Sequence, residues 1–265
     1  MRIELHPYSE IAKYLETKDT ILMPIGAVEQ YGPHLAIGTE LRIVGRIAQD
    51  AAEKAGLAVA PVVPFNYSHM FLDFPGTMSV KMRTIEDYVG QVAHGLASQG
   101  FRRFFFVNIH AGSLGSLESV CRSLRSRWNC VGGLIDVFSV MRDVSGVEYG
   151  TKKAPTGHAS EMVTAVALHL APELVFMDRV ESPSELRSFV DGVNTVSSGK
   201  VAYGDSSFQV FSDISDYAPL GMQGDAGAAT AEKGKIIYES ARDYIAEAAT
   251  KFSAMVLNPK SNEGR

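Results

Sequence analysis

The chain of 265 residues carries a formal net charge of −5, and 46% of its residues are hydrophobic. This length and apolar content suit one large α/β domain or two small ones, and they exclude a wholly disordered chain. The net acidity argues against a nucleic-acid-binding protein, which needs a surplus of basic side chains to meet phosphate.

Hydropathy and cysteine content point to a cytoplasmic protein. No apolar run approaches 18 residues, and the first residues lack the apolar core of a signal peptide, so we expect neither a membrane span nor a membrane partner. Two cysteines, Cys121 and Cys130, are too few for a disulfide framework or a thiolate zinc cluster. We therefore expect two free thiols in a reducing compartment.

Short apolar runs alternate with segments of helical periodicity along most of the chain. In chain order, the pattern predicts a strand at 20–25, a helix at 41–55, a strand at 57–63, a helix at 84–97, a strand at 103–109, a helix at 114–128, a strand at 132–138, and helices at 159–170 and 226–252.

Strands that are apolar on both faces and alternate with helices are typical of a parallel sheet covered on two sides. The sequence thus predicts a single domain over residues 1–265, a three-layer α/β/α sandwich with a mainly parallel sheet. Residues 182–222 depart from this pattern because Ser, Gly and Asp are frequent there. This irregular segment fits a hairpin, a lid or an oligomer arm equally well.

The chemistry is expected where the strands end, because ligands bind beyond the carboxyl ends of parallel strands. Glu29 and Glu40 follow the first predicted strand, and His110 follows the third. His158 and Glu161 lie at the start of the helix at 159–170. Imidazole and carboxylate groups that converge from separate loops are typical of a metal site.

Each of these residues also has a purely structural interpretation. Glu29 could accept hydrogen bonds from backbone N–H groups, and Glu40 could interact with the dipole of the helix that it precedes. His110 could be a buried, hydrogen-bonded core residue, and His158 and Glu161 could cap their helix. No Walker loop, GxGxxG motif or nucleophile elbow offers a competing function.

Five segments of the chain resemble motifs of the creatininase family of amidohydrolases. Residues 29–35, E-Q-Y-G-P-H-L, followed by G-T-E at 38–40, are similar to the family's E-Q-H-G-P-H-L-P and T-D. Further matches are F-P-G-T at 74–77, N-I-H-A-G-S at 108–113, H-A-S-E with Thr164 at 158–164, and the start of the C-terminal helix at 229–234. They occur in family order and span residues 17–240.

The resemblance implies a creatininase-like α/β/α fold, a homo-oligomer that is commonly a hexamer, and a divalent metal site that holds Zn, Mn or Fe. It implies hydrolysis of a C–N bond in a small cyclic or linear amide. Carried over by position, Glu29, Glu40 and His110 would bind metal. Glu161 would be a further ligand or a general base, His158 would transfer protons, and Ser68 would lie near the substrate.

Two departures from the family pattern bear on the metal. Tyr31 stands where the family has a histidine ligand, and Glu40 stands where it has aspartate. A neutral phenol is a poor ligand at pH 7, so we expect one tightly bound metal, with Tyr31 contacting the substrate instead. Creatinine itself is not the expected substrate. Gly112 replaces a glutamate ligand, and the single tryptophan, Trp128, lies on a predicted helix away from the site.

Three functions remain open on this evidence. The first is a metal-dependent amidohydrolase in which a metal-activated water attacks the amide. The second is a hydrolase of another bond type, such as a lactone, an oxidised sugar or a peptide. The third is a degenerate member of the family that binds a small molecule without turnover.

Overall fold

A four-stranded parallel sheet forms the centre of the protein, with strand order β2-β1-β3-β4. The computed structural model describes residues 1–148, 157–181, 186–197 and 199–256. The strands are β1 (Thr20–Ile25), β2 (Ala58–Val59), β3 (Arg103–Asn108) and β4 (Val131–Asp136). Every neighbouring pair is parallel, so the carboxyl ends of all four strands lie at one edge of the sheet.

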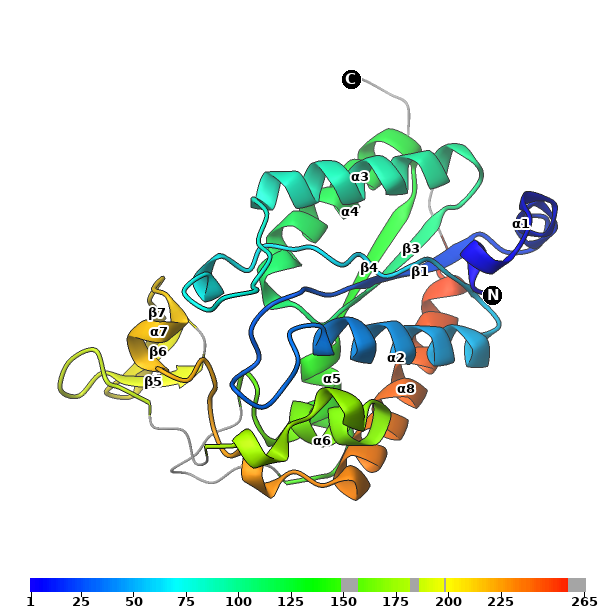
Figure 1. Ribbon diagram of the computed structural model, residues 1–265. Coiled ribbons are helices and arrows are strands. Elements are labelled where there is room, and N and C mark those ends of the chain that lie inside the picture. The colour runs from blue at the N-terminus through cyan, green and yellow to red at the C-terminus, as the bar shows by residue number, and fades with distance from the viewer. Residues whose placement is uncertain (149–156, 182–185, 198, 257–265) are drawn as a thin grey trace.

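Helices cover both faces of this sheet, which confirms the predicted three-layer α/β/α arrangement (Figure 1). One layer contains α3 (Met82–Ser98) and α4 (Leu114–Trp128). The opposite layer contains α2 (Thr39–Ala55), α5 (Val137–Val144), α6 (Glu161–Leu170) and α8 (Ala231–Ser253). No helix among the described ranges is both long enough and apolar enough to cross a membrane.

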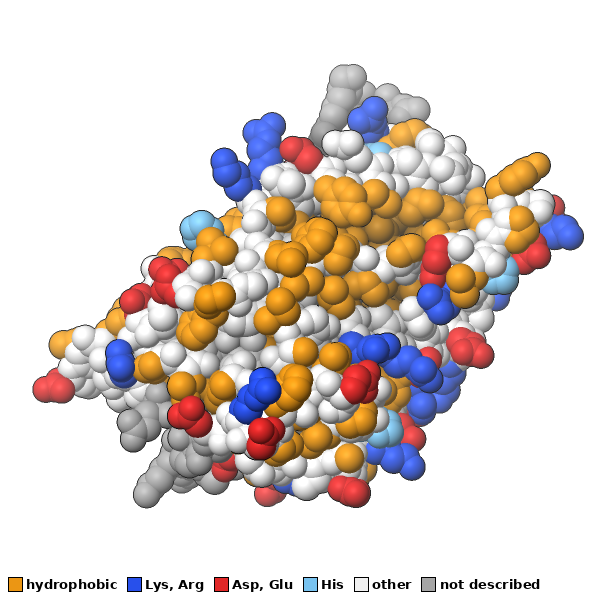
Figure 2. Space-filling model, viewed as in Figure 1, with side chains coloured by type: hydrophobic (Ala, Val, Ile, Leu, Met, Phe, Trp, Pro, Cys, Tyr) orange, Lys and Arg blue, Asp and Glu red, His pale blue; other side chains and the backbone are white. Residues whose placement is uncertain are grey.

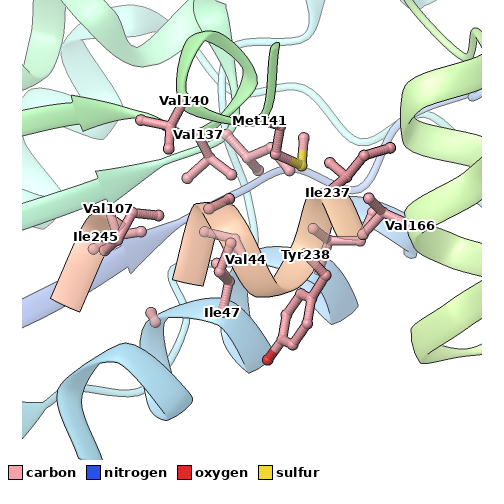
Figure 3. Packing of buried hydrophobic residues seen from close by; sticks show 14 of the residues in the cluster. Val44, Ile47, Val107, Val137, Val140, Met141, Val166, Ile237, Tyr238 and Ile245 are labelled. Carbon is pink, nitrogen blue, oxygen red and sulfur yellow. The ribbon is translucent and has the colours of Figure 1, made fainter. Parts of the chain in front are cut away.

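Two hydrophobic clusters hold the layers together, one on each face of the sheet. Because side chains alternate along a strand, Phe104 and Phe106 of β3 pack toward α3 and α4, while Phe105 and Val107 pack toward the other layer. In that second layer, side chains of α2, α5 and α6 pack against those of α8 (Figure 3). Gly234 lets α8 approach α6 closely, since a Cβ there would lie 1.8 Å from the Ala165 carbonyl oxygen.

Several boundaries differ from the prediction for local reasons. The strand expected at 57–63 has only two residues of regular ladder, Ala58 and Val59, and pairs with β1 again only at a single bridge between Val63 and Ile25. The fourth strand stops at Asp136, whose side chain accepts a hydrogen bond from the backbone N–H of Phe138 and starts α5. The short helix α1 (Tyr8–Leu15) was not predicted.

The irregular segment contains a second, antiparallel sheet with strand order β5-β6-β7, formed by Asn194–Ser197, Lys200–Tyr203 and Ser206–Gln209. It is followed by α7 (Ile214–Tyr217). Figure 1 shows this small sheet at the end of the sandwich toward which the strands of the main sheet point. Residues 182–185 and 198 of the segment lie outside the described ranges.

Short 3₁₀ helices complete the connections at Ile3–Leu5, His69–Phe71, Ala111–Ser113, Pro172–Leu174, Met177–Arg179 and Ala226–Ala228. The surface is strongly apolar on one side: Figure 2 shows hydrophobic side chains gathered between α3 and α2. On α3 itself, Met82, Tyr88 and Val92 are exposed. Cys121 and Cys130 are free thiols, as expected.

Candidate metal centre

Three ligand-type side chains meet at the carboxyl edge of the main sheet. Glu29 lies in the loop after β1, Glu40 in the first turn of α2, and His110 two residues after the end of β3. One potential ligand atom from each residue lies within 4.8 Å of the other two, and all three side chains are buried. Within the described part of the chain, this is the one such group of three.

The ring of His110 is held so that its Nδ1 atom faces the two carboxylates. Its Nε2 atom lies 2.8 Å from the Tyr67 carbonyl oxygen, which can only accept, so Nε2 carries the proton and donates it. This leaves Nδ1 facing the carboxylates, 3.4 Å from Glu29 Oε2 and 3.6 Å from Glu40 Oε2, where it would bind a metal ion once its proton is displaced. A backbone carbonyl that fixes the tautomer in this way is typical of metal-binding histidines.

The residues after β3 form a small hydrogen-bonded loop that supports His110. The Asn108 side-chain amide donates to the His110 carbonyl oxygen at 2.8 Å. The Ser113 hydroxyl lies 2.8 Å from Asn108 Oδ1 and 2.7 Å from the same His110 carbonyl. Both side chains are buried, so this loop presents His110 in one fixed position.

The carboxylates fit a divalent cation because their inner oxygens lack other partners. Glu29 Oε2 and Glu40 Oε2 are buried and accept no hydrogen bond of good geometry from any described residue. A buried charged oxygen without a partner is costly unless a cation or a proton satisfies it. Two such oxygens and one imidazole nitrogen match the hard and borderline ligands that Zn²⁺, Mn²⁺ and Fe²⁺ accept.

The electrostatics of the cluster show how closely its members interact. Burial and the charge of Glu29 raise the pKa of Glu40 to about 7. Burial alone would lower the pKa of His110, but the two carboxylates outweigh it and raise that pKa well above its usual value. Burial would raise the pKa of Glu29, but the neighbouring imidazolium of His110 lowers it. Without a cation, the cluster therefore holds protons that a cation would displace.

Tyr31 lies beside the cluster as a hydrogen-bond donor to Glu40. Its hydroxyl is 2.9 Å from Glu40 Oε1, and the side chain is completely buried. Burial and the adjoining carboxylates raise the pKa of Tyr31 well above 10, so the phenol is neutral at pH 7. In this geometry the hydroxyl hydrogen points to Glu40 and not to a substrate carbonyl.

His158 stands next to the cluster as a neutral imidazole. Its ring packs between Tyr31 and Phe71, with ring centroids 4.2 Å and 4.5 Å away. Nε2 lies 2.8 Å from the Gln30 carbonyl oxygen and donates to it, whereas Nδ1 is 3.9 Å from Glu29 Oε1. Burial lowers the pKa of His158, so Nδ1 is free of a proton at neutral pH.

Two residues expected at the site occupy its margins. Glu161 is buried, but its carboxylate accepts a hydrogen bond from Lys233 on α8, and it is not part of the three-residue group. Ser68 is buried close enough to Glu29 to lower the pKa of that carboxylate, while its Oγ has no hydrogen-bond partner of good geometry within the described ranges. Neither residue lines the pocket described next.

A pocket of about 860 Å³ opens above the cluster. Glu29, Glu40, His110 and His158 form its polar part. The opposite wall comes from the irregular segment, with residues 209–213 and Asp216 among its lining. The segment that could not be interpreted from the sequence is therefore a wall of the candidate active site.

Several supporting residues were not anticipated from the sequence. The Tyr67 carbonyl is a backbone group, and no side-chain pattern reveals its role. Gln223 contacts the backbone of His158 twice. Its side-chain Oε1 accepts a hydrogen bond from the His158 backbone N–H at 3.2 Å, and its own backbone N–H donates to the His158 carbonyl oxygen at 2.8 Å. Both contacts join segments far apart in the chain, so neither has a local sequence signal.

Curated relatives share most of the length of this chain. A "Mycofactocin precursor peptide peptidase" from Mycolicibacterium smegmatis is 28% identical over 224 residues, which cover 82% of this chain and 79% of the relative. A "3-dehydro-scyllo-inosose hydrolase" from Thermotoga maritima is 26% identical over 250 residues, covering 89% and 78%. The names describe two different hydrolytic reactions.

Solved structures show the same fold. A putative creatinine amidohydrolase from Bacteroides fragilis superposes with a TM-score of 0.81 at 21% identity, covering 98% of both chains. Creatininase structures described as a Zn-Zn type and as a Mn form superpose with TM-scores of 0.71 and 0.73, each covering 94% of this chain and 97% of the other, at 21% and 22% identity. The sequence model of the creatininase family, described as creatinine amidohydrolase, matches residues 5–249. The chain therefore belongs to the creatininase family.

Proposed function

We propose that this protein is a metal-dependent hydrolase that cleaves the C–N bond of a small cyclic or linear amide. The observation that carries the proposal is the pair of buried carboxylate oxygens of Glu29 and Glu40 without a hydrogen bond of good geometry, which face Nδ1 of His110 at the base of a pocket. A divalent ion bound by these residues would supply Lewis acidity, which polarises a carbonyl group and acidifies water.

The residues of the chain divide the remaining work. His110 is held in its ligand tautomer by Tyr67, and Glu40 is oriented by the Tyr31 hydroxyl. His158 has a free Nδ1 beside Glu29 and is the candidate to accept a proton from water and return it to the leaving nitrogen. Its second nitrogen is fixed by the Gln30 carbonyl, so the ring cannot turn away.

We further propose that one metal ion binds tightly. A second ion beside Glu40 would need another ligand, and Tyr31 offers only a neutral hydroxyl that already donates to Glu40. The carboxylate of Glu161 is neutralised by Lys233. The described residues thus supply one compact set of three ligands and no second set.

We also retain the proposals of a cytoplasmic location and a homo-oligomer. The apolar surface between α3 and α2 supports the homo-oligomer, because contiguous exposed hydrophobic side chains are typical of interfaces between chains (Figure 2).

The test is hydrolysis by protein loaded separately with Zn²⁺, Mn²⁺ or Fe²⁺. The panel should contain cyclic amides, linear amides, lactones and oxidised cyclic sugars. Release of an amine from an amide, abolished by chelation and by Glu29→Gln, supports the proposal. Hydrolysis of lactones or oxidised sugars alone would favour the other bond types, as the relative from Thermotoga maritima suggests. Absence of turnover with every metal would favour a non-catalytic binding protein.

A further inference from the structure

The part of the pocket that lies away from the cluster is mainly apolar. Phe71 and Met162 are buried near His158, and Met70, Phe138, Val210 and Phe211 also line the pocket. Its volume of about 860 Å³ lies in the upper part of the range for small-molecule sites, roughly 300–1,000 Å³. A small cyclic amide at the cluster would leave most of this apolar surface in contact with water.

The charged groups around the mouth of the pocket already have partners. Asp213 and Asp216 cap α7 by accepting hydrogen bonds from each other's backbone N–H groups. The Arg142 guanidinium donates to Asp143 at 2.8 Å. Beside these groups the lining contains the hydrophobic side chains of Phe138, Val210 and Phe211, which a hydrophobic group of a ligand would cover with a gain in stability.

Phe211 is the most exposed hydrophobic side chain of this wall. Its side chain is 92% exposed, although the residue contributes to the pocket lining. When an apolar group of a ligand covers a phenylalanine ring that is otherwise exposed to water, the free energy of the complex is lowered. Phe211 is the second residue after β7, and the residue between them, Val210, is anchored to the small sheet because its N–H donates to the Gly199 carbonyl at 3.1 Å.

We infer that the pocket selects amides that carry an aromatic or branched aliphatic group beyond the scissile bond, and that Phe211 is a specificity-determining residue that contacts this group. The inference rests on the proposed amide hydrolysis and names its substrate class. In this arrangement the metal-binding residues hold the reacting amide, while the wall provided by the irregular segment binds the part of the substrate that does not react.

The test compares two probes with the same scissile amide, N-acetylphenylalaninamide and N-acetylglycinamide, on metal-loaded protein. Equilibrium binding is measured for the wild type, Phe211→Ala and Tyr203→Ala. Tyr203 is the control because it is a 64% exposed aromatic residue on the same small sheet and does not line the pocket. Both substitutions are at exposed side chains, so neither should disturb folding.

We expect the wild type and Tyr203→Ala to bind the phenylalanine probe about 10-fold more tightly than the glycine probe, a preference of the size that burial of one apolar side chain provides. Phe211→Ala should lose most of this preference. Equal binding of the two probes by the wild type, or an equal loss for both probes in Phe211→Ala, overturns the inference. Turnover of the same probes tests amide hydrolysis separately: selective binding without turnover refutes the proposed reaction alone.

Discussion

Substitution of Gly112 perturbs the metal centre without replacing any of the proposed ligands. A Cβ at this position would lie 2.2 Å from the Tyr67 carbonyl oxygen and 2.6 Å from His110 Nε2. These are the two atoms of the 2.8 Å hydrogen bond that fixes the His110 tautomer. The methyl group that Gly112→Ala adds would therefore clash with both the donor and the acceptor of this hydrogen bond.

The size of the effect follows from these distances. Since Cβ contacts shorter than 3.0 Å are essentially never seen, residue 112 and the Tyr67 carbonyl have to move apart by about 0.8 Å. A displacement of that size taken up by the Tyr67 carbonyl would lengthen its 2.8 Å bond to His110 Nε2 beyond normal hydrogen-bonding distance. Loss of a partner that orients a metal-binding histidine typically weakens metal affinity by about 10- to 100-fold, or about 1.4–2.8 kcal/mol.

The assay is a competition titration of Zn²⁺ or Mn²⁺ against a chelating dye, with Gly115→Ala as the matched control. Gly115 lies three residues later in α4, and a Cβ there meets nothing within 4 Å. The Tm of each metal-free variant reports whether the fold survives. Nitrogen NMR of histidine-labelled protein reports whether His110 keeps the proton on Nε2.

We expect Gly115→Ala to bind metal like the wild type and Gly112→Ala to bind it at least about 10-fold more weakly. The Gly112→Ala protein should remain folded and lose the single His110 tautomer. A folded Gly112→Ala protein with unchanged metal affinity would refute the claim that the Tyr67 carbonyl orients His110.

Three further predictions concern protons. His158→Ala should lower turnover about 10²–10⁴-fold while metal content stays unchanged; loss of metal would instead identify His158 as a ligand. Metal affinity should rise at least about tenfold between pH 6 and pH 7.5, because the raised pKa values of His110 and Glu40 keep protons on the cluster at low pH. A metal Kd that does not change with pH would contradict this. Burial lowers the pKa of His34 from 6.5 to about 4, so between these pH values the unfolded chain binds a proton that the folded chain does not. The free energy of unfolding of the wild type should therefore fall by about 3 kcal/mol from pH 6.5 to pH 4. Urea denaturation should show a much smaller fall in His34→Gln.

The layers of the fold could be predicted because the spacing of apolar residues in each segment indicates which residues are buried and whether the segment is a strand or a helix. The strand at Thr20–Ile25 and the helix at Leu114–Trp128 have the predicted bounds. The boundary between β4 and α5 was missed because one polar residue, Asp136, interrupts an apolar run and acts as a helix cap there. A hairpin was one of three interpretations of residues 182–222, and the sequence could not single it out because the strands are four residues long and mostly exposed, which leaves no clear alternation of apolar and polar side chains.

The convergence of Glu29, Glu40 and His110 follows from one general rule, that parallel strands end at a common edge. The same rule placed Glu161 near the cluster, but it could not reveal the cation of Lys233, which reaches Glu161 from α8, 72 residues away in the chain. Nor could it show that the Tyr31 hydroxyl donates to Glu40. Which partner a side chain selects depends on distances of a few tenths of an ångström, and those are set by packing between distant segments.

The most direct test of the account is the metal content of protein purified without chelator, measured per chain by elemental analysis. We predict about one equivalent of a divalent transition metal, lost in Glu29→Gln and in His110→Ala. The absence of bound metal after incubation with Zn²⁺, Mn²⁺ or Fe²⁺ would contradict the metal centre. Two tightly bound equivalents would contradict the role assigned to Tyr31.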